Sequence, residues 1–210
     1  MTNYSVEIKK LVKYFGRRLI FDDINFKFSS QNIYGVSGPN GSGKSTLVKI
    51  VANLISATRG EVVHKVQDKV IEEEQLHNYL GFVSPYLYLY DEFTAEENLI
   101  HISSIRGIKY PKEKAEHLLN EVNLFERRHD LVRGYSSGMK QRLKFIFALL
   151  HQPQLLIFDE PTSNLDNAGK EKVYELISAE GKNNIVIIAS NENADLNLCK
   201  QVIELEKFKR

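Results

Sequence analysis

The chain has 210 residues, 42% hydrophobic and 26% charged, the balance of one globular domain that can bury a core. The net charge is +1 with both signs mixed, so no nucleic-acid partner is expected. The longest apolar run, Phe145 to Leu150, is too short to span a membrane, and no signal stretch opens the chain. The single cysteine, Cys199, excludes an internal disulfide and fits a reducing compartment.

The first part of the chain has the pattern of β-strands. Val6 and Ile8, and later Ile24, Phe26 and Phe28, alternate with polar residues, as in half-buried antiparallel strands. A compact apolar strand, NIYGVSG, then ends in glycine and leads into the helical pattern TLVKIVANL. Short strands are expected in GEVVHKVQDKVIEEE and in YLGFV.

From residue 85 to about residue 150 the pattern is helical. Thr94 and Glu97 form a capping box, and Pro111 opens a second helix with an apolar face. Strands return in LLIFD and NIVIIAS with a helix between them, which indicates a parallel α/β sheet.

The predicted fold class is therefore α/β, in one domain over residues 1–210. Residues 1–84 and 151–210 would form an α/β core with an N-terminal antiparallel β subdomain. Residues 85–150 would form an inserted helical subdomain.

The stretch GPNGSGKST contains the complete pattern G-x-x-x-x-G-K-[ST] between a strand and a helix. Its glycines let consecutive N–H groups point at phosphate oxygens. Lys44 is expected to reach the β- and γ-phosphates, and the Ser45 hydroxyl to bind Mg²⁺. The alternative is a glycine-rich turn without a ligand, but the complete pattern favours a nucleoside triphosphate site. The predicted loop residues are Gly38, Pro39, Asn40, Gly41, Ser42, Gly43, Lys44, Ser45 and Thr46.

Asp159 and Glu160 follow a buried strand, at the end where α/β sheets bind ligands. We expect Asp159 to hold Mg²⁺ through water and Glu160 to polarise the attacking water. An acidic pair that only caps a strand is the alternative.

A second glycine–serine loop, YSSGMKQR, also runs into a helical pattern and so offers a second anion site. Alone it would be an ordinary helix N-cap. Together with the first loop and DEPTSNLD, it makes nearly the whole chain similar to the ATP-binding cassette (ABC) ATPases. The resemblance assigns a signature loop to Ser136, Ser137, Gly138 and Met139, and a D-loop to Asn164, Leu165 and Asp166.

In that family the signature loop of one subunit closes over the γ-phosphate held by the phosphate loop of another. The resemblance therefore implies ATP, Mg²⁺, and a second copy of the chain or a similar ABC subunit as partner. It also implies a transmembrane permease subunit, and a cytoplasmic location, peripheral on the inner face of the membrane. An aromatic ring stacks on adenine in the family: Phe15 matches best, with Tyr14 second, and a core role is the alternative for both.

Two positions depart from the family. Pro85 stands where the family usually has a glutamine that contacts Mg²⁺. After the last core strand, Ser190 and Asn191 stand where a histidine usually touches the γ-phosphate, so Asn191 is the candidate for that role. The six histidines have no metal-ligand spacing.

The stretch PYLYLYDEF has tyrosines at 86, 88 and 90. It is either a short buried strand or an exposed patch that docks the membrane subunit, and we favour the patch.

Three functions compete: the ATPase subunit of a membrane transporter, a soluble ABC ATPase, and a P-loop small-molecule kinase. The first is favoured, and the compact length resembles small exporter-type subunits such as those assigned to haem export. The second usually has a long insertion or a tandem cassette, and the third has no signature loop.

Overall fold

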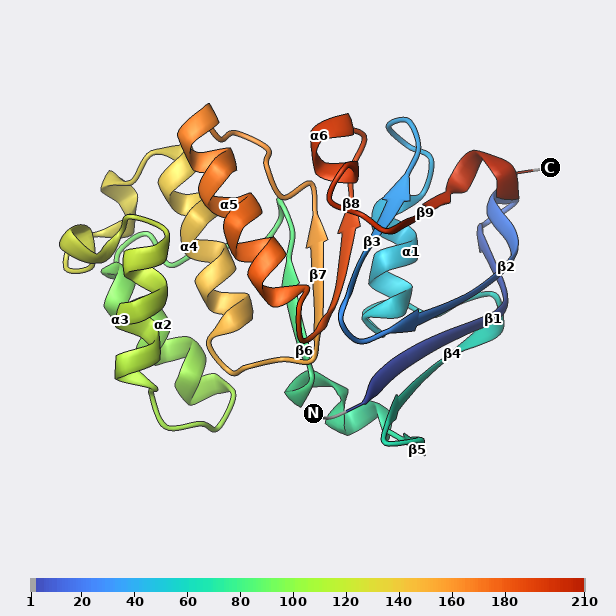
Figure 1. Cartoon of the computed structure of the whole chain (residues 1–210), viewed down its shortest axis with the longest axis horizontal. Helices are drawn as coiled ribbons and strands as arrows, with labels where there is room; N and C mark the ends of the chain where they lie inside the picture. The colour runs from blue at the N-terminus through green and yellow to red at the C-terminus, as the bar shows by residue number, and fades with distance from the viewer. Residues whose placement is uncertain (1–2, 210) are drawn as a thin grey trace.

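The computed structural model describes residues 3–209, which form two sheets and a layer of helices (Figure 1). The parallel sheet has the order β6-β7-β8-β3-β9, and the antiparallel sheet has the order β2-β1-β4-β5. The parallel strands are β3 (Asn32–Ser37), β6 (Leu80–Val83), β7 (Leu155–Asp159), β8 (Ile185–Ala189) and β9 (Gln201–Glu204). The antiparallel strands are β1 (Tyr4–Phe15), β2 (Arg18–Ser29), β4 (Arg59–Val66) and β5 (Lys69–Val70).

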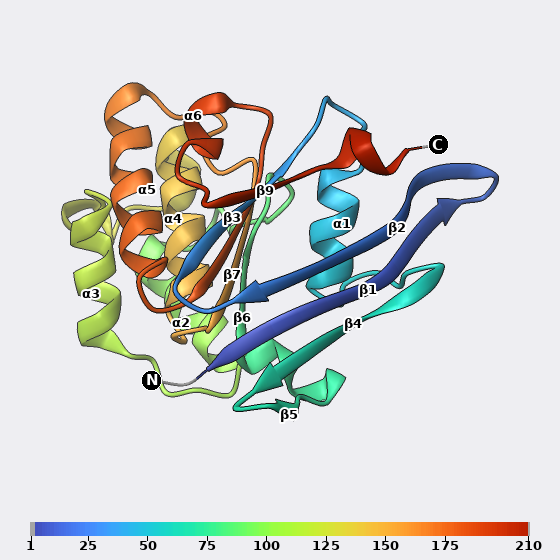
Figure 2. The same ribbon diagram turned by 45° about the vertical axis from the view of Figure 1, so that its right-hand side comes forward.

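Helices cover both faces of the parallel sheet. Helix α1 lies between the two sheets, whereas α2 to α5 lie on the opposite face of the parallel sheet (Figures 1 and 2). The helices are α1 (Lys44–Val51), α2 (Ala95–Ile105), α3 (Lys112–Glu121), α4 (Ser137–Leu149), α5 (Asn167–Glu180) and α6 (Asn193–Leu196). The predicted α/β class is confirmed, with an antiparallel sheet at the N-terminus and a parallel core.

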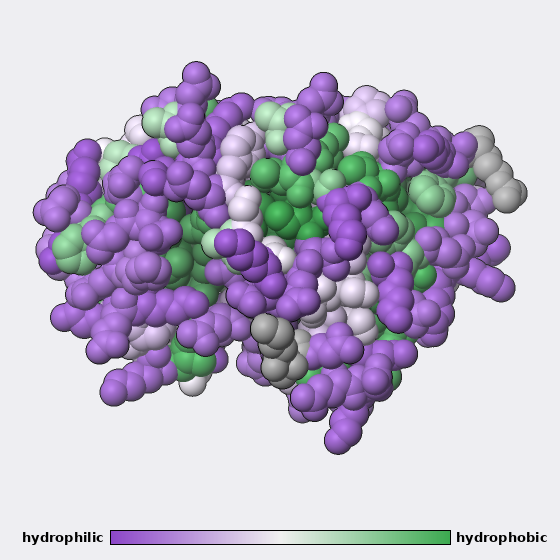
Figure 3. Space-filling view, in the orientation of Figure 1, coloured by the Kyte–Doolittle hydropathy of each residue, from purple (hydrophilic) through white to green (hydrophobic). Residues whose placement is uncertain are grey.

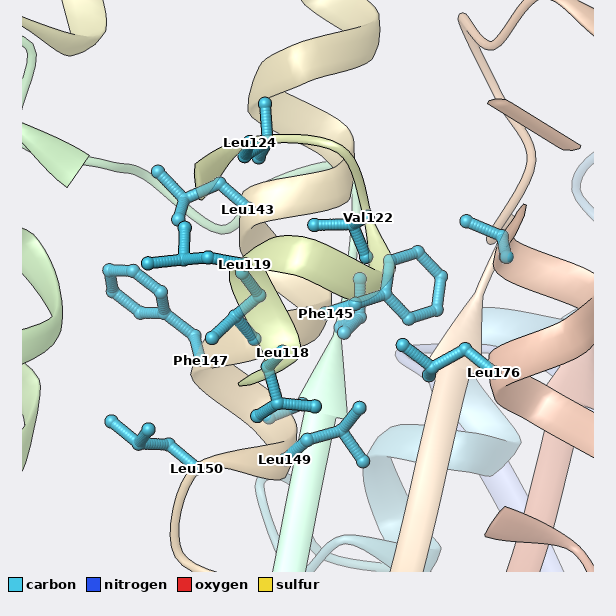
Figure 4. Packing of buried hydrophobic residues seen from close by; sticks show 14 of the residues in the cluster. Leu118, Leu119, Val122, Leu124, Leu143, Phe145, Phe147, Leu149, Leu150 and Leu176 are labelled. Atoms are coloured by element: carbon cyan, nitrogen blue, oxygen red, sulfur yellow. The ribbon is translucent and has the colours of Figure 1, made fainter. Parts of the chain in front are cut away.

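The alternation of side chains along β7 divides the interior into two cores. Leu155 and Ile157 pack with α1 and the antiparallel sheet. Leu156 and Phe158 point the other way and pack with the helices of residues 95–149. Figure 4 shows part of that second core, including Leu119 of α3 and Phe145 of α4. Because both faces of β7 are covered, its sequence is an unbroken apolar run rather than an alternating one.

Local signals explain where the helices begin. The Thr94 side chain accepts a hydrogen bond from the Glu97 backbone at 3.1 Å, and the Glu97 carboxylate accepts one from the Thr94 backbone at 2.8 Å. The predicted capping box of α2 is thus confirmed. Pro111 is the N-cap of α3, which begins one residue later than predicted.

Some boundaries differ from the prediction. Helix α1 begins at Lys44 and ends at Val51, because Asn53 adopts a left-handed φ of 55° that stops the helix before Leu54. Strand β9 was not predicted, since QVIE is short and lies at the sheet edge. Hydrophilic side chains cover α3 to α5 on the face in Figure 3, while hydrophobic ones gather near α6 and β9. Within residues 3–209, no helix combines the length and apolarity needed to cross a bilayer.

Candidate functional site

The loop between β3 and α1 wraps around the lysine that follows it. Gly41 and Gly43 have φ of 76° and 107°, and a Cβ on Gly43 would collide with the Ile20 side chain. Glycine at 43 is therefore required both by the backbone conformation and by the close approach of β2. Lys44 is buried, and its Nζ donates to the Gly38 carbonyl at 2.8 Å. Two positive-φ glycines and a helix N-terminus give the loop the geometry of an anion cradle.

An acidic group faces this cradle from the end of β7. The Ser45 hydroxyl donates to Asp159 Oδ1 at 3.0 Å, although the two residues are far apart in the sequence. Burial raises the pKa of Asp159, and its Oδ2 is buried without a hydrogen-bond partner within residues 3–209. A buried carboxylate oxygen without a partner is costly unless a cation neutralises it. A hydroxyl and a carboxylate are oxygen ligands of the type Mg²⁺ prefers, so these residues fit the ion.

Glu160 turns toward the same lysine. Its backbone adopts a left-handed φ of 51°, held by a hydrogen bond from the Ser163 hydroxyl to the Glu160 carbonyl at 2.9 Å. The Glu160 carboxylate lies 3.5 Å from Lys44 Nζ. Partial burial raises the pKa of Glu160, and the nearby Lys44 charge opposes this rise. A carboxylate with a raised pKa is a stronger base once ionised, which suits proton transfer near neutral pH.

These groups meet in one open cleft of about 450 Å³. Its lining residues are Phe15, Arg18, Ile20, Asn40, Gly41, Gly43, Lys44, Ser45, Thr46, Pro85, Tyr86, Asp159 and Glu160. Phe15 is therefore brought to the phosphate loop, whereas Tyr14 does not line the cleft. Lys13 Nζ lies 4.7 Å from the centroid of the Phe15 ring, over one of its two faces. Gly38 and Pro39 contribute to a separate hollow of about 400 Å³ beside Asn191, and Ser42 is buried.

The segment after β8 brings Asn191 to the phosphate loop but buries Ser190. The Asn191 amide donates to the Asn40 side chain at 3.4 Å, so Asn191 reaches the phosphate loop but does not line the cleft with Lys44. Ser190 is fully buried and donates to Asp195 Oδ2 at 2.6 Å. Ser190 is therefore not available to a phosphate group.

The second glycine–serine loop begins α4. The Ser136 side chain accepts a hydrogen bond from the Met139 backbone at 3.2 Å, and Ser136 and Ser137 are both exposed. A Cβ on Gly138 would lie 3.4 Å from the Asn164 carbonyl, so the predicted signature loop packs against the predicted D-loop. Next to it, the Asp166 side chain caps α5 by accepting from the Gly169 backbone at 2.9 Å.

The two cradles lie on opposite sides of the parallel sheet. Both α1 and α4 have their N-terminal ends toward the upper edge in Figure 1, the edge to which the arrows of β7 and β8 also point. The two loops therefore face the same edge without sharing a cleft. The cleft around Lys44 is lined by residues of the first loop and none of residues 136–139.

The tyrosines after β6 are exposed, with 72%, 87% and 57% of their surface accessible for Tyr86, Tyr88 and Tyr90. The intervening Leu87 and Leu89 pack against the helical core, so the alternation presents tyrosines to solvent. The buried-strand alternative is wrong. Tyr86 and Tyr88, but not Tyr90, line a groove of about 360 Å³, referred to below as the tyrosine groove. Its lining residues are Pro85, Tyr86, Leu87, Tyr88, Leu89, Asp91, Ser137, Lys140, Gln141, Lys144, Ser163 and Asn164.

Two features were not predicted from the sequence. Arg18 lines the cleft beside Phe15, and its place in the β1–β2 hairpin next to the predicted aromatic residue was the available signal. Asp195 is buried and accepts hydrogen bonds from the hydroxyls of Thr162 (2.9 Å), Tyr174 (2.8 Å) and Ser190 (2.6 Å). No local pattern marks this cluster, because its members come from four separate segments. Within residues 3–209, no three or more His, Cys, Asp or Glu side chains are grouped so that they could hold a metal ion.

Comparison with known proteins identifies the family. The ABC transporter family model matches residues 21–163. The chain belongs to the ABC transporter family. It is 36% identical to the lipoprotein-releasing system ATP-binding protein LolD of Treponema denticola, over 83% of this chain and 82% of LolD. It is 31% identical to HrtA of Staphylococcus haemolyticus, an ATP-binding protein with a proposed role in hemin import, over 98% of each chain. A solved ATP-binding subunit of an ABC transporter superposes with a TM-score of 0.81, at 24% identity, over 95% of this chain and 85% of that one.

The ABC chain is accordingly an ATP-binding subunit of the transporter type and an ATPase. These relatives do not support the soluble ABC ATPase or the small-molecule kinase. Other relatives are longer, and the ABC chain spans about two thirds of their length (68%, 66% and 66%).

Proposed function

We propose that the cleft around Lys44 binds Mg-ATP and that two ABC chains close on two nucleotides, each held between the phosphate loop of one chain and the signature loop of the other. The proposal rests above all on the contact between Ser45 and Asp159 beside Lys44, because it joins a phosphate cradle to a buried carboxylate whose Oδ2 has no hydrogen-bond partner within residues 3–209.

Different residues of the cleft have different roles in ATP binding and hydrolysis. The backbone N–H groups of the phosphate loop and Lys44 hold the phosphates, while Phe15 stacks on adenine. Ser45 and Asp159 hold Mg²⁺, which when bound offsets the negative charge of the phosphate oxygens. Glu160 orients a water molecule and accepts its proton as the water oxygen attacks the γ-phosphorus and the bond to ADP breaks.

Two chains are needed because one loop cannot surround the γ-phosphate. The N-terminus of α4 carries the exposed residues Ser136 and Ser137, yet its own chain holds it on the other side of the parallel sheet from α1. Donors at a helix N-terminus favour an anion. A second chain, or a similar ABC subunit, would supply the missing donors from Ser136, Ser137 and Gly138.

Replacing Lys44 by alanine tests the nucleotide site. Loss of the buried ammonium should weaken Mg-ATP binding at least tenfold in calorimetric titrations and abolish hydrolysis, since a charged hydrogen bond contributes about 1.5–3 kcal/mol. Lys172→Ala is the matched control, because Lys172 pairs with Glu175 on α5, away from the cleft. Unchanged ATP affinity in Lys44→Ala would contradict the assignment.

The tyrosine groove is proposed to receive a cytosolic segment of a transmembrane permease, which would hold the ABC chain at the inner face of the membrane. Exposed tyrosines suit this role because they bury large areas at a low entropy cost. LolD and HrtA are named for different cargoes, so the choice of cargo is assigned to the membrane partner.

The variant Tyr88→Ser tests this docking site in cells, because Tyr88 lines the groove but not the nucleotide cleft. It should keep its fold and its ATP binding while shifting from the membrane fraction to the soluble fraction. Ile105→Ser, which removes an exposed hydrophobic residue of α2 outside the groove, should leave the distribution unchanged. Equal membrane association of all three proteins would refute docking through the tyrosine groove.

A further inference from the structure

Two residues, Pro85 and Tyr86, line both the nucleotide cleft and the tyrosine groove. The Pro85 side chain has no hydrogen-bonding group, whereas the Tyr86 phenol can donate and accept a hydrogen bond. We propose that the Tyr86 phenol contacts the bound nucleotide, so that nucleotide occupancy changes the wall of the groove. This inference rests on the proposed ATP site.

A β-turn holds Tyr86 in this position. The Leu87 backbone donates to the Ser84 carbonyl at 3.1 Å, which makes Pro85 and Tyr86 the two central residues of the turn. Proline is favoured at the first central position because its φ is already fixed near the required value. Pro85 thus has no polar side chain of its own, but it favours the turn that places Tyr86 beside the cleft and the groove.

The turn is tied to the helix that carries the second glycine–serine loop. Lys144 Nζ, on α4, donates to the Pro85 carbonyl at 3.0 Å and to the Ser84 carbonyl at 3.4 Å. Two backbone oxygens of the turn are therefore held by one cation of the helical layer. A displacement of α4 would carry the turn, and with it Tyr86.

A lysine of α1 lies beside the Tyr86 ring. Lys49 Nζ, on α1, lies 5.4 Å from the centroid of the Tyr86 ring, a cation–π distance. Tyr86 lines the cleft together with Lys44, Asp159 and Glu160. The ring thus lies beside the charges that surround the proposed Mg-ATP, and its hydroxyl can both donate and accept a hydrogen bond.

Tyr88 provides an internal comparison. It is two residues further along, is more exposed than Tyr86, and lines the groove but not the nucleotide cleft. A nucleotide effect seen at position 86 and missing at position 88 would therefore distinguish contact with the ligand from a general change in the exposed segment.

The absence of tryptophan from the chain allows a direct test. Tyr86→Trp and Tyr88→Trp each introduce a single indole reporter, and Mg-AMP-PNP is titrated under conditions where sedimentation shows monomer. The Tyr86→Trp emission should change and saturate with the Kd that calorimetry gives for the same variant, whereas the Tyr88→Trp emission should stay constant. Tyr86→Phe, which removes only the hydroxyl, should weaken nucleotide binding by about tenfold, and Tyr88→Phe should not.

A wrong role for Tyr86 and a wrong ATP site would give different results. A constant Tyr86→Trp emission while calorimetry records bound nucleotide, or equal affinities for Tyr86→Phe and the natural protein, would overturn the role of Tyr86 and leave the ATP site standing. No calorimetric binding to the natural protein would overturn the ATP site itself, and the role of Tyr86 with it.

Discussion

Replacing Asp195 by alanine should destabilise the ABC chain strongly, although Asp195 does not line the nucleotide cleft. The carboxylate is 1% exposed and accepts three hydroxyl hydrogen bonds of 2.6–2.9 Å. These hydroxyls come from Thr162, two residues after Glu160, from Tyr174 on α5, and from Ser190 after β8. The cluster thus ties together the segments that follow β7 and β8.

The expected loss of unfolding free energy follows from those three bonds. A hydrogen bond to a charged group contributes about 1.5–3 kcal/mol, so three would contribute about 4.5–9 kcal/mol if no donor found another partner. Hydroxyls rotate and water can enter the space left by the side chain, which places the expected loss near the lower bound, about 3–5 kcal/mol. Asp195→Asn keeps the shape and one acceptor oxygen, and should lose about half as much.

Urea denaturation followed by circular dichroism at pH 7 measures these differences. Thermal unfolding should show a fall of roughly 10 °C for Asp195→Ala, given about 2–4 °C per kcal/mol for a chain of this size. Glu126→Ala, at an exposed acidic position, should stay within about 0.5 kcal/mol of the natural protein. A loss below 1 kcal/mol for Asp195→Ala would refute the stabilising role of the cluster.

Three further outcomes are expected. Burial lowers the pKa of both His64 and His151 to about 4, so the unfolded chain takes up these protons before the folded one as pH falls below 6.5, and each histidine should lower the stability by about 2 kcal/mol from pH 7 to pH 5 in urea titrations. His64→Gln should remove about half of that dependence, and an equal slope would contradict the assignment. Phe15→Ala should weaken Mg-ATP binding by about fivefold to tenfold in calorimetry, whereas an equal effect of Tyr14→Ala would remove the distinction between the two rings. Asn191→His should raise the basal ATPase rate several-fold by adding a group that can carry charge, and a slower rate would refute the role at the γ-phosphate that the family resemblance assigns to position 191.

Much of the fold was predictable because its signals are local. The run at residues 155–158 reads as a strand buried on both faces, and the capping box at Thr94 and Glu97 marks the start of α2 without any tertiary information. Strand β9 was missed because four residues at a sheet edge carry too little pattern, and its place depends on pairing with β3.

In the candidate site, too, the residues with local sequence signals were predictable and those placed by tertiary packing were not. The phosphate loop is contiguous, so its sequence alone predicts its conformation, and the family resemblance supplied Phe15 as a neighbour. The hydrogen bonds of Asp195 and the place of the Pro85–Tyr86 turn beside the nucleotide cleft depend on packing between distant segments, and no spacing in the sequence reports that. Asn191 was placed by its order after a strand, which brought it to the phosphate loop but not into the cleft.

The central claim, that two cradles from two chains enclose ATP, is tested most directly by sedimentation of Glu160→Gln with saturating Mg-ATP. Slowed hydrolysis should trap a species of twice the chain mass that disappears when the nucleotide is removed. Adding Ser137→Asp should abolish this dimer, because a carboxylate in the first turn of α4 suits the helix but repels the partner's γ-phosphate. A Glu160→Gln protein that binds Mg-ATP yet stays monomeric, or a dimer indifferent to Ser137→Asp, would contradict the shared site.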